Sequence, residues 1–310
     1  MHTNDVATPR TRHYGQFYGL DPLPATGELA LVAGNCQAES IRIVLDGADL
    51  PTVRVPAVHE LTAADLPHLD RLLGRATVLV TQPIRDDYHD LPLGSRQLTA
   101  RMRHGARTVT VPVIRFAGLY PAHALVRLPD APGLEPPVVA YHDLRTLAEA
   151  ADLLAGRPVR RRRRIDVHRV RAVGELSLGE LRRRESAAGT TGVSDLFARP
   201  TFDQMRTINH PGNPVWSAVA ARVRERLGID PSVQDPGRPL LDSVHAPREE
   251  TVAEAWDLDG TPNDDWIVEG VRIPDDEVRD AHLGWYAAHP EVVAAGMRRH
   301  RDTLDALGLQ

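Results

Sequence analysis

Short apolar runs alternate with amphipathic segments along the first half of the chain. Runs with the length of buried strands lie at 29–34, 51–58, 77–82, 108–114 and 138–141. Helical patterns lie between them, at 37–45, 61–73 and 95–104. Strands that alternate with helices are typical of a parallel sheet with helices on both faces. The pattern therefore predicts a doubly wound, mostly parallel α/β fold in three layers, with LALVAG (29–34) as a central strand.

The second half of the chain has a different pattern. An arginine-rich and partly helical stretch at 158–187 precedes a short strand at 205–209 and a helix at 213–228. Residues 229–272 are rich in Pro, Asp and Gly and are predicted to be loop, and two helical patterns fill 274–307. We therefore expect a polar N-terminal arm (1–26), a catalytic α/β domain (27–228) and a C-terminal extension (229–310). The extension begins as loop, becomes helical and packs on the domain.

Composition removes several function classes. The chain has 310 residues, a net charge of −5 and no lysine, so all 37 basic residues are arginine. The absence of lysine excludes Schiff-base catalysis and the P-loop lysine. The acidic balance, without aromatic residues between the basic ones, disfavours nucleic acid as a partner. Arg160–Arg164 is either a solvated face or a site for the phosphates of a nucleotide-like cofactor.

The single cysteine excludes an internal disulfide and is compatible with a reducing compartment. The first residues contain no apolar core of signal-peptide length, and no stretch approaches the roughly 20 apolar residues that span a bilayer. We expect a cytoplasmic protein without membrane insertion. The dinucleotide-binding, Walker, HExxH and GxSxG motifs are absent, and no metal site is expected.

The strongest candidate chemistry follows the first strand, in Gly34-Asn35-Cys36-Gln37. Ligands of such sheets bind beyond the carboxyl ends of the strands. Glycine permits a tight turn there, and Cys36 would begin a helix whose dipole favours a thiolate. The same backbone N–H groups could bind an oxyanion. The alternative is a buried cysteine that packs as a small hydrophobic residue.

Three other strand ends carry polar candidates. Gln82 ends the third strand and could donate to an oxyanion, although the residues after it, which include Arg85 and Tyr88, also have ordinary turn character. His142 follows the run at 138–141 as a base or an orienting group, while its neighbour Asp143 could simply cap the next helix. His210, just before the helix at 213–228, is either a general base or a loop histidine bonded to the backbone.

Six segments in this order and spacing resemble the WcbI-like family of capsular polysaccharide biosynthesis: VAGNCQAES, TQPIRDDYH, VPVIRFAGLYP, VVAYHD, LRRRES and TINHPGNP. The resemblance covers about 29–228. It implies an SGNH-hydrolase-like fold, coenzyme A binding and acyl transfer. Cys36 would then replace the usual nucleophilic serine, framed by Gly34, Asn35 and Gln37.

The resemblance also gives roles to two later residues. Gln82 falls near the oxyanion donor of SGNH enzymes, and His210 falls near their late catalytic histidine. Thr207 stands where those enzymes carry an aspartate. We expect the thiol of coenzyme A to point toward Cys36, with its phosphates near Arg85, Arg115 or the arginine run and with Tyr88 completing the contacts.

The leading hypothesis is thus transfer of an acyl group, most simply acetyl from acetyl-CoA, to a saccharide hydroxyl during polysaccharide biosynthesis. A hydrolase with a cysteine nucleophile would use the same residues with water as the acceptor. A coenzyme A- or glycan-binding module without catalysis is the third hypothesis.

Overall fold

A computed structural model of the chain describes residues 8–25, 27–159, 164–260 and 262–310. Its contacts divide the chain into two compact units. The first comprises Met1–Val113, Arg184–Val193 and Asn213–Leu240, and the second comprises Ile114–Arg183, Ser194–Gly212 and Leu241–Gln310. This division differs from the expected segments 1–26, 27–228 and 229–310, because the chain leaves each unit and later returns to it.

The first unit is built on a four-stranded parallel sheet in the order β2-β1-β3-β4. The strands are β1 (Ala30–Ala33), β2 (Thr52–Val53), β3 (Val78–Thr81) and β4 (Arg107–Thr110). Strand β1 lies inside the sheet and pairs with β2 on one side and β3 on the other. The parallel α/β fold with a central first strand is therefore confirmed. Strand β2 is shorter than the run at 51–58, which is interrupted by prolines that cannot donate to a ladder.

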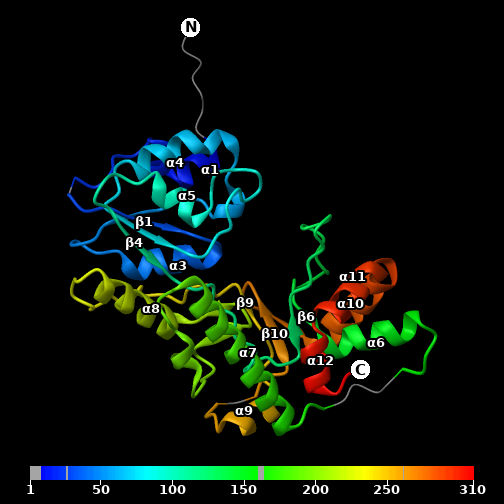
Figure 1. Cartoon of the computed structure of the whole chain (residues 1–310). Coiled ribbons are helices and arrows are strands. Elements are labelled where there is room, and N and C mark those ends of the chain that lie inside the picture. Colours follow the sequence, from blue (N-terminus) through cyan, green and yellow to red (C-terminus); the bar gives the residue numbers. More distant parts are fainter. Residues whose placement is uncertain (1–7, 26, 160–163, 261) are drawn as a thin grey trace. The chain divides into compact units, whose positions relative to one another are not determined.

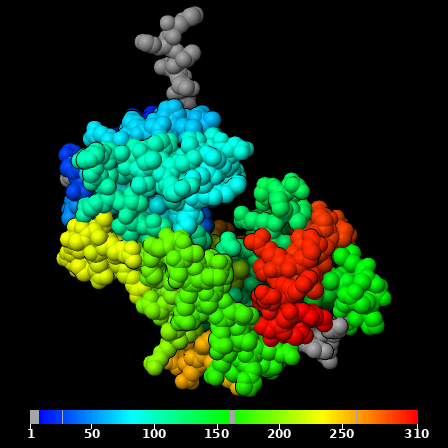
Figure 2. All heavy atoms as spheres, viewed as in Figure 1, coloured from blue at the N-terminus to red at the C-terminus, as the bar shows by residue number. Residues whose placement is uncertain are grey.

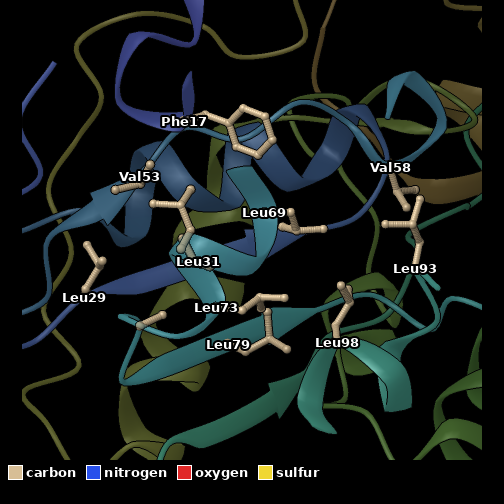
Figure 3. Close-up of a cluster of buried hydrophobic side chains, with 12 residues drawn as sticks. Phe17, Leu29, Leu31, Val53, Val58, Leu69, Leu73, Leu79, Leu93 and Leu98 are labelled. Carbon is tan, nitrogen blue, oxygen red and sulfur yellow. The ribbon is translucent and has the colours of Figure 1, made fainter. Parts of the chain in front are cut away.

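One face of this sheet carries a leucine-rich core. Leu29, Leu31 and Leu79 pack there with Leu69 and Leu73 of α4 (Leu66–Leu73), as Figure 3 shows. The helix α5 (Ser95–Ala100) adds Leu98 to the same cluster. Each fully buried leucine contributes about 1.5–3 kcal/mol relative to an exposed one.

The opposite face is covered by α3 (Cys36–Leu45), on which α8 (Asn213–Arg226) packs. Because side chains alternate along a strand, Ala30 and Val32 point to this face, and both are buried. Figure 1 shows α4 and α5 on one side of the sheet and α3 and α8 on the other. The first unit thus has the expected three layers.

The N-terminal segment differs from the polar arm that the sequence suggested. Within residues 8–25, α1 (Pro9–His13) and α2 (Gly15–Tyr18) form two short helices. Phe17 of α2 is 0% exposed and belongs to the leucine-rich core. Arg10 and Tyr18 bond to the buried carboxylate of Asp65, at 3.2 and 2.7 Å. The buried ring of Phe17 and the bonds to Asp65 hold this segment in place. Its sequence has no apolar periodicity, so the two helices were not predicted.

The second unit contains a helical layer. Helices α10 (Asp275–Ala288) and α11 (Pro290–Arg299) pack against α6 (Leu144–Leu154), and α12 (Arg301–Leu307) follows α11 (Figures 1 and 2). The α6–α11 contact depends on Gly296, since a Cβ there would lie 2.6 Å from the side chain of Leu147. The predicted C-terminal helices are therefore confirmed.

The expected fifth strand at 138–141 is wrong. Val138 adopts a positive φ of 71°, which no regular strand accommodates. The strand β6 (His142–Asp143) comes after it and pairs antiparallel with β5 (His123–Ala124) in a separate small sheet. The expected strand at 205–209 is β7 (Met205–Thr207), which pairs antiparallel with β8 (His210–Pro211).

The expected loop at 229–272 is also wrong in part. It holds β9 (Val244–His245), α9 (Glu250–Trp256), β10 (Asp265–Val268) and the start of β11 (Val271–Pro274). These strands form an antiparallel sheet in the order β11-β10-β9. Glu269 and Gly270 both have positive φ and make the tight turn of the β10–β11 hairpin.

The remaining elements are α7 (Val167–Ala188) and three 3-10 turns, η1 (Val58–Glu60), η2 (Ala63–Asp65) and η3 (Ser194–Phe197). Thr62 and Asp65 form a capping box ahead of α4. Among the described residues, no helix combines the length and apolar character needed to cross a bilayer.

Candidate functional site

Cys36 lies at the junction between β1 and α3, at the carboxyl end of the central strand. It is the first residue of α3 and is exposed. The alternative of a cysteine buried as a small hydrophobic residue is therefore wrong. The turn depends on Gly34, because a Cβ at that position would lie 2.3 Å from Oε1 of Gln82.

The side chain of Gln82 organises this turn. Its Oε1 accepts a hydrogen bond from the N–H of Asn35 at 2.9 Å, and its Nε2 donates to Oε1 of Gln37 at 3.2 Å. Asn35 in turn caps α3, since its Oδ1 accepts from the N–H of Gln37 at 2.9 Å. Two neighbouring strands, β1 and β3, thus fix the residues on both sides of Cys36.

This geometry changes the expected role of Gln82. The side chain is 1% exposed and both ends of its amide bond within the turn. The other N–H of Nε2 is directed at the Pro112 carbonyl oxygen, 3.5 Å from Nε2, so neither donor is available to an oxyanion without breaking the network. Gln37, also 1% exposed, likewise contributes to the framework of the turn. We assign both as positioning residues for Cys36.

Filling the space at Gly34 should destabilise the first unit. In the Gly34→Ala variant the new methyl group overlaps the buried Gln82 amide, and we expect a loss of about 1–3 kcal/mol in the free energy of unfolding. Urea denaturation followed by circular dichroism measures the change. Gly27→Ala is the matched control, because a Cβ there meets no atom within 4 Å. Equal stability of both variants would contradict the close approach of Gln82.

Arg85 and Tyr88 follow β3, in the segment after Gln82. The Arg85 guanidinium lies 5.9 Å from the centre of the Tyr88 ring and is exposed. Ser95 at the start of α5 holds the beginning of this segment: its hydroxyl donates to the Gln82 carbonyl at 2.7 Å and accepts from the N–H of Ile84 at 2.8 Å. An exposed guanidinium on an aromatic ring is suited to a phosphate or a planar base.

The other candidates belong to the second unit. His210 begins β8, and its ring meets that of Tyr141 edge-on at 6.0 Å. Burial, with the charge of Arg206 as a smaller cause, lowers the pKa of His210 to about 4. The imidazole is therefore neutral near pH 7, the form that can accept a proton. Its Nδ1 forms no hydrogen bond within the described part of the chain.

Thr207 and Asn209, which precede His210 in the β7–β8 hairpin, both bond to Tyr141. The Thr207 hydroxyl lies 2.9 Å from the Tyr141 hydroxyl, which donates to Oδ1 of Asn209 at 2.8 Å. Tyr141 therefore links the β7–β8 hairpin to the segment before β6. No sequence motif predicted this hydroxyl network, because it joins residues 66 and 68 positions apart.

His142 is placed as a core residue. It is 0% exposed, and its Nδ1 lies 2.6 Å from the hydroxyl of Tyr286 in α10. Burial lowers the pKa of His142 to about 3. A substrate cannot reach a ring enclosed in this way. Its neighbour Asp143 caps α6 by accepting from the N–H groups of Arg145 and Thr146, so the structural alternative for Asp143 is confirmed.

The predicted phosphate contacts also include Arg115 and the arginine run at 160–164. Arg115 is exposed in the second unit, and its charge helps to lower the pKa of His300. Of the arginine run, Arg160–Arg163 fall outside the described residues, and Arg164 forms an exposed ion pair with Glu250.

Buried histidines should make the second unit sensitive to acid. Burial is the largest cause of a lowered pKa at each of His123, His142, His210, His282 and His300. The unfolded chain therefore binds more protons below about pH 6.5, so stability is complete above that pH and falls as the pH decreases toward the folded pKa values. Each such histidine contributes a slope of at most about 1.4 kcal/mol per pH unit.

We expect the free energy of unfolding to fall between pH 7 and pH 5, as measured by urea denaturation across that range. His142→Gln should flatten the slope by at most about 1.4 kcal/mol per pH unit, because it removes one buried histidine. Asp65, whose pKa the bonds from Arg10 and Tyr18 hold at about 2 against the opposing effect of burial, affects stability only at lower pH. Stability that does not vary between pH 7 and 5 would contradict this assignment.

Comparison with known proteins places the chain in a family. Residues 29–232 match the family model described as polysaccharide biosynthesis enzyme WcbI. No curated protein matches the chain significantly. A solved structure of WcbI, described as a novel polysaccharide biosynthesis enzyme, shares 18% sequence identity and a TM-score of 0.74, over 92% of this chain and 99% of that one. That structure is described as the native protein without a disulfide bond between coenzyme A and a cysteine. Because the family match spans well over half of the residues, the chain belongs to the WcbI family of polysaccharide biosynthesis enzymes.

Proposed function

We propose that this enzyme transfers an acyl group, most simply acetyl, from coenzyme A to a saccharide hydroxyl. One observation carries the proposal: its only cysteine is exposed at the first position of α3, beyond the carboxyl end of the central strand. Ligands of parallel α/β sheets bind at such strand ends. A polysaccharide biosynthesis enzyme with a thiol at that position is suited to acyl chemistry on sugars.

Coenzyme A is the proposed donor because the description of the similar WcbI structure refers to coenzyme A and a cysteine, in a form without a disulfide bond between them. Cys36 is the only cysteine of this chain, so it is the proposed partner of the coenzyme's thiol end. Arg85, stacked on Tyr88 after the adjacent strand, offers an exposed charge for a phosphate. Arg115 is the second candidate for a phosphate contact.

The first proposed step loads Cys36. Its thiolate attacks the thioester carbonyl, a new carbon–sulfur bond forms, and the bond to the coenzyme's sulfur breaks, so that coenzyme A leaves as a thiolate and takes up a proton. The helix dipole at the start of α3 favours the negative charge on Cys36. Gln82 and Asn35 hold the backbone on either side of the sulfur and limit its movement.

The second proposed step discharges the acyl group. A sugar hydroxyl attacks the acyl-cysteine carbonyl, its proton passes to a base, and the Cys36 thiolate is released. His210 is the proposed base because its imidazole is neutral near pH 7, the form that can accept a proton. Cys36 and His210 belong to different units. Turnover by the single and double variants tests whether the two residues act together.

Intact-mass spectrometry after incubation with acetyl-CoA tests the proposal. We expect a gain of one acetyl group on the wild-type chain and none on Cys36→Ala. Addition of a suitable sugar should remove the label and yield acetylated sugar. Acetyl-CoA turnover without any acetylated protein would indicate direct transfer, and an inert thiol would contradict the proposal.

A cysteine-dependent deacylase is the second candidate, since an acyl group on the exposed thiol could pass to water as well as to a sugar hydroxyl. An acyl-cysteine that decays at the same rate with and without saccharide would favour hydrolysis. Failure to bind coenzyme A would favour it further.

A further inference from the structure

Glu39 places a negative charge next to the proposed nucleophile. It lies in the first turn of α3, three residues after Cys36. Residues three apart on a helix share one face, so their side chains are neighbours. The helix dipole favours a carboxylate at this position, but the carboxylate opposes a second negative charge on the sulfur of Cys36. Without a partner, Glu39 would therefore reduce the fraction of reactive thiolate.

Two guanidinium groups neutralise this carboxylate. Arg42, on the same helix, donates from Nε to Oε2 of Glu39 at 2.7 Å and from Nη2 to Oε1 at 3.0 Å. Nε of Arg54 lies 3.1 Å from the same Oε1. Arg42 alone would balance the charge of Glu39. With Arg54, two positive charges and one negative charge leave the three side chains, which we call the Glu39 group, with a net charge of +1.

Arg54 reaches Glu39 from a neighbouring strand. It directly follows β2, which pairs with β1. The segment after it is bonded to the turn before Cys36, since the N–H of Val58 donates to the carbonyl of Gly34 at 2.8 Å. The side chains of Arg54 and Glu39 are 39% and 27% exposed, so water screens their charges only in part. The charge of Arg54 therefore acts at the carboxyl end of the sheet, where Cys36 lies.

The N-terminal segment holds Arg54 in this position. The guanidinium lies 5.6 Å from the centre of the Tyr14 ring, and its Nη1 lies 3.5 Å from Nδ1 of His13. The Tyr14 hydroxyl donates to Glu60 at 3.3 Å, which fixes the ring. His13 and Tyr14 precede the stretch 29–232 that matches the family model. The segment that contains α1 and α2 thus supports a residue beside the proposed nucleophile.

We propose that Arg54 is a positioning residue of the Cys36 site, which keeps the thiol reactive by holding the carboxylate of Glu39 in an ion pair. The inference rests on the proposed function, since it takes Cys36 as the nucleophile. It adds that the excess positive charge of the Glu39 group, together with the helix dipole, stabilises the attacking thiolate.

Other charged side chains of the first unit are common to every variant considered below. Helix α8 packs on α3, and its charged residues, at 222–226, lie toward the far end of α3, where Arg224 pairs with Asp49. Because these side chains do not change, a difference between variants reports the Glu39 group. The charged or titratable side chains on the segments around Cys36 include His13, Tyr14, His59, Glu60 and Arg85.

The pH dependence of alkylation by iodoacetamide, measured on the full-length chain, tests this inference. Cys36 is the only cysteine, so the rate reports one thiolate. Arg54→Gln removes one positive charge, and we expect the alkylation midpoint to rise by about half a pH unit, with about a threefold slower reaction below it. Glu39→Gln removes the negative charge and should lower the midpoint by a similar amount. Both shifts should shrink as salt rises.

Three further variants separate charge from structure. Arg54→Lys keeps the charge and should retain most of the wild-type midpoint. Arg54→Gln combined with Glu39→Gln leaves only the charge of Arg42, again +1, so its midpoint should return toward that of the wild type. Arg183→Gln breaks an exposed ion pair with Glu180 on α7 and should leave the midpoint unchanged. Circular dichroism confirms that each variant is folded.

Three results would overturn the proposal. They are a wild-type midpoint in Arg54→Gln, an equal rise in Arg54→Lys, and a rise instead of a fall in Glu39→Gln. Alkylation requires no acetyl-CoA, so an unshifted midpoint removes the role of Arg54 and leaves the acyl-transfer proposal standing. Conversely, a shifted midpoint in a chain that accepts no acetyl group supports the effect of Arg54 on the thiol and contradicts only the proposed reaction.

Discussion

The Cys36→Ala variant is expected to lose acyl transfer by about three orders of magnitude or more, the scale of removing a nucleophile that forms a covalent intermediate. Without the thiolate, the acyl group has no acceptor on the protein, and a sugar hydroxyl must attack the donor directly. Steady-state turnover of acetyl-CoA in the presence of a saccharide acceptor measures the loss.

The fold should survive this change. Cys36 is exposed, and the turn around it is held by Gly34, Asn35 and Gln82 rather than by its sulfur. We expect the free energy of unfolding to change by no more than about 0.5 kcal/mol, as for most surface substitutions. Cys36→Ser is the closest control, because it keeps the size and polarity but replaces the thiol by a hydroxyl of much higher pKa. Full turnover in Cys36→Ala would show that the acyl group never resides on the protein.

The position of Cys36 could be predicted from the sequence because its signals are local. An apolar run, a glycine and an amphipathic segment follow one another within a few residues, and this order indicates a strand, a tight turn and a helix. The parallel sheet followed from repetition of the same pattern. Each of these features depends on neighbours in sequence, so a single chain is sufficient to reveal it.

The second unit could not be predicted to the same depth because its contacts join distant residues. The β10–β11 hairpin carries its turn signal at Glu269-Gly270, but the surrounding acids and prolines gave it the appearance of loop. His142 follows an apolar run as a strand-end residue would, yet Tyr286 encloses it from 144 positions away. Similarly, the buried amide of Gln82 was predicted to face a substrate because its partners, Asn35 and Gln37, lie on another strand–helix junction.

His210→Ala is expected to lower turnover by about two orders of magnitude or more, the usual scale for a general base. The neutral imidazole would take the proton of the attacking sugar hydroxyl, and no other described side chain is assigned that step. His168→Ala is the matched control, since His168 is exposed on α7. A fold check is needed for His210→Ala, because the ring packs on Tyr141.

The double variant decides whether Cys36 and His210 act as one unit. If His210 works only on the acyl group held by Cys36, the double variant should be about as slow as Cys36→Ala alone, because removal of one member already disables the other. If the two residues act independently, their effects on the logarithm of turnover should add. In the mass experiment, His210→Ala should still accept an acetyl group on Cys36 but release it slowly to the sugar. An acyl-cysteine that forms and discharges at wild-type rates in His210→Ala would exclude His210 as the base and leave the proton to another group.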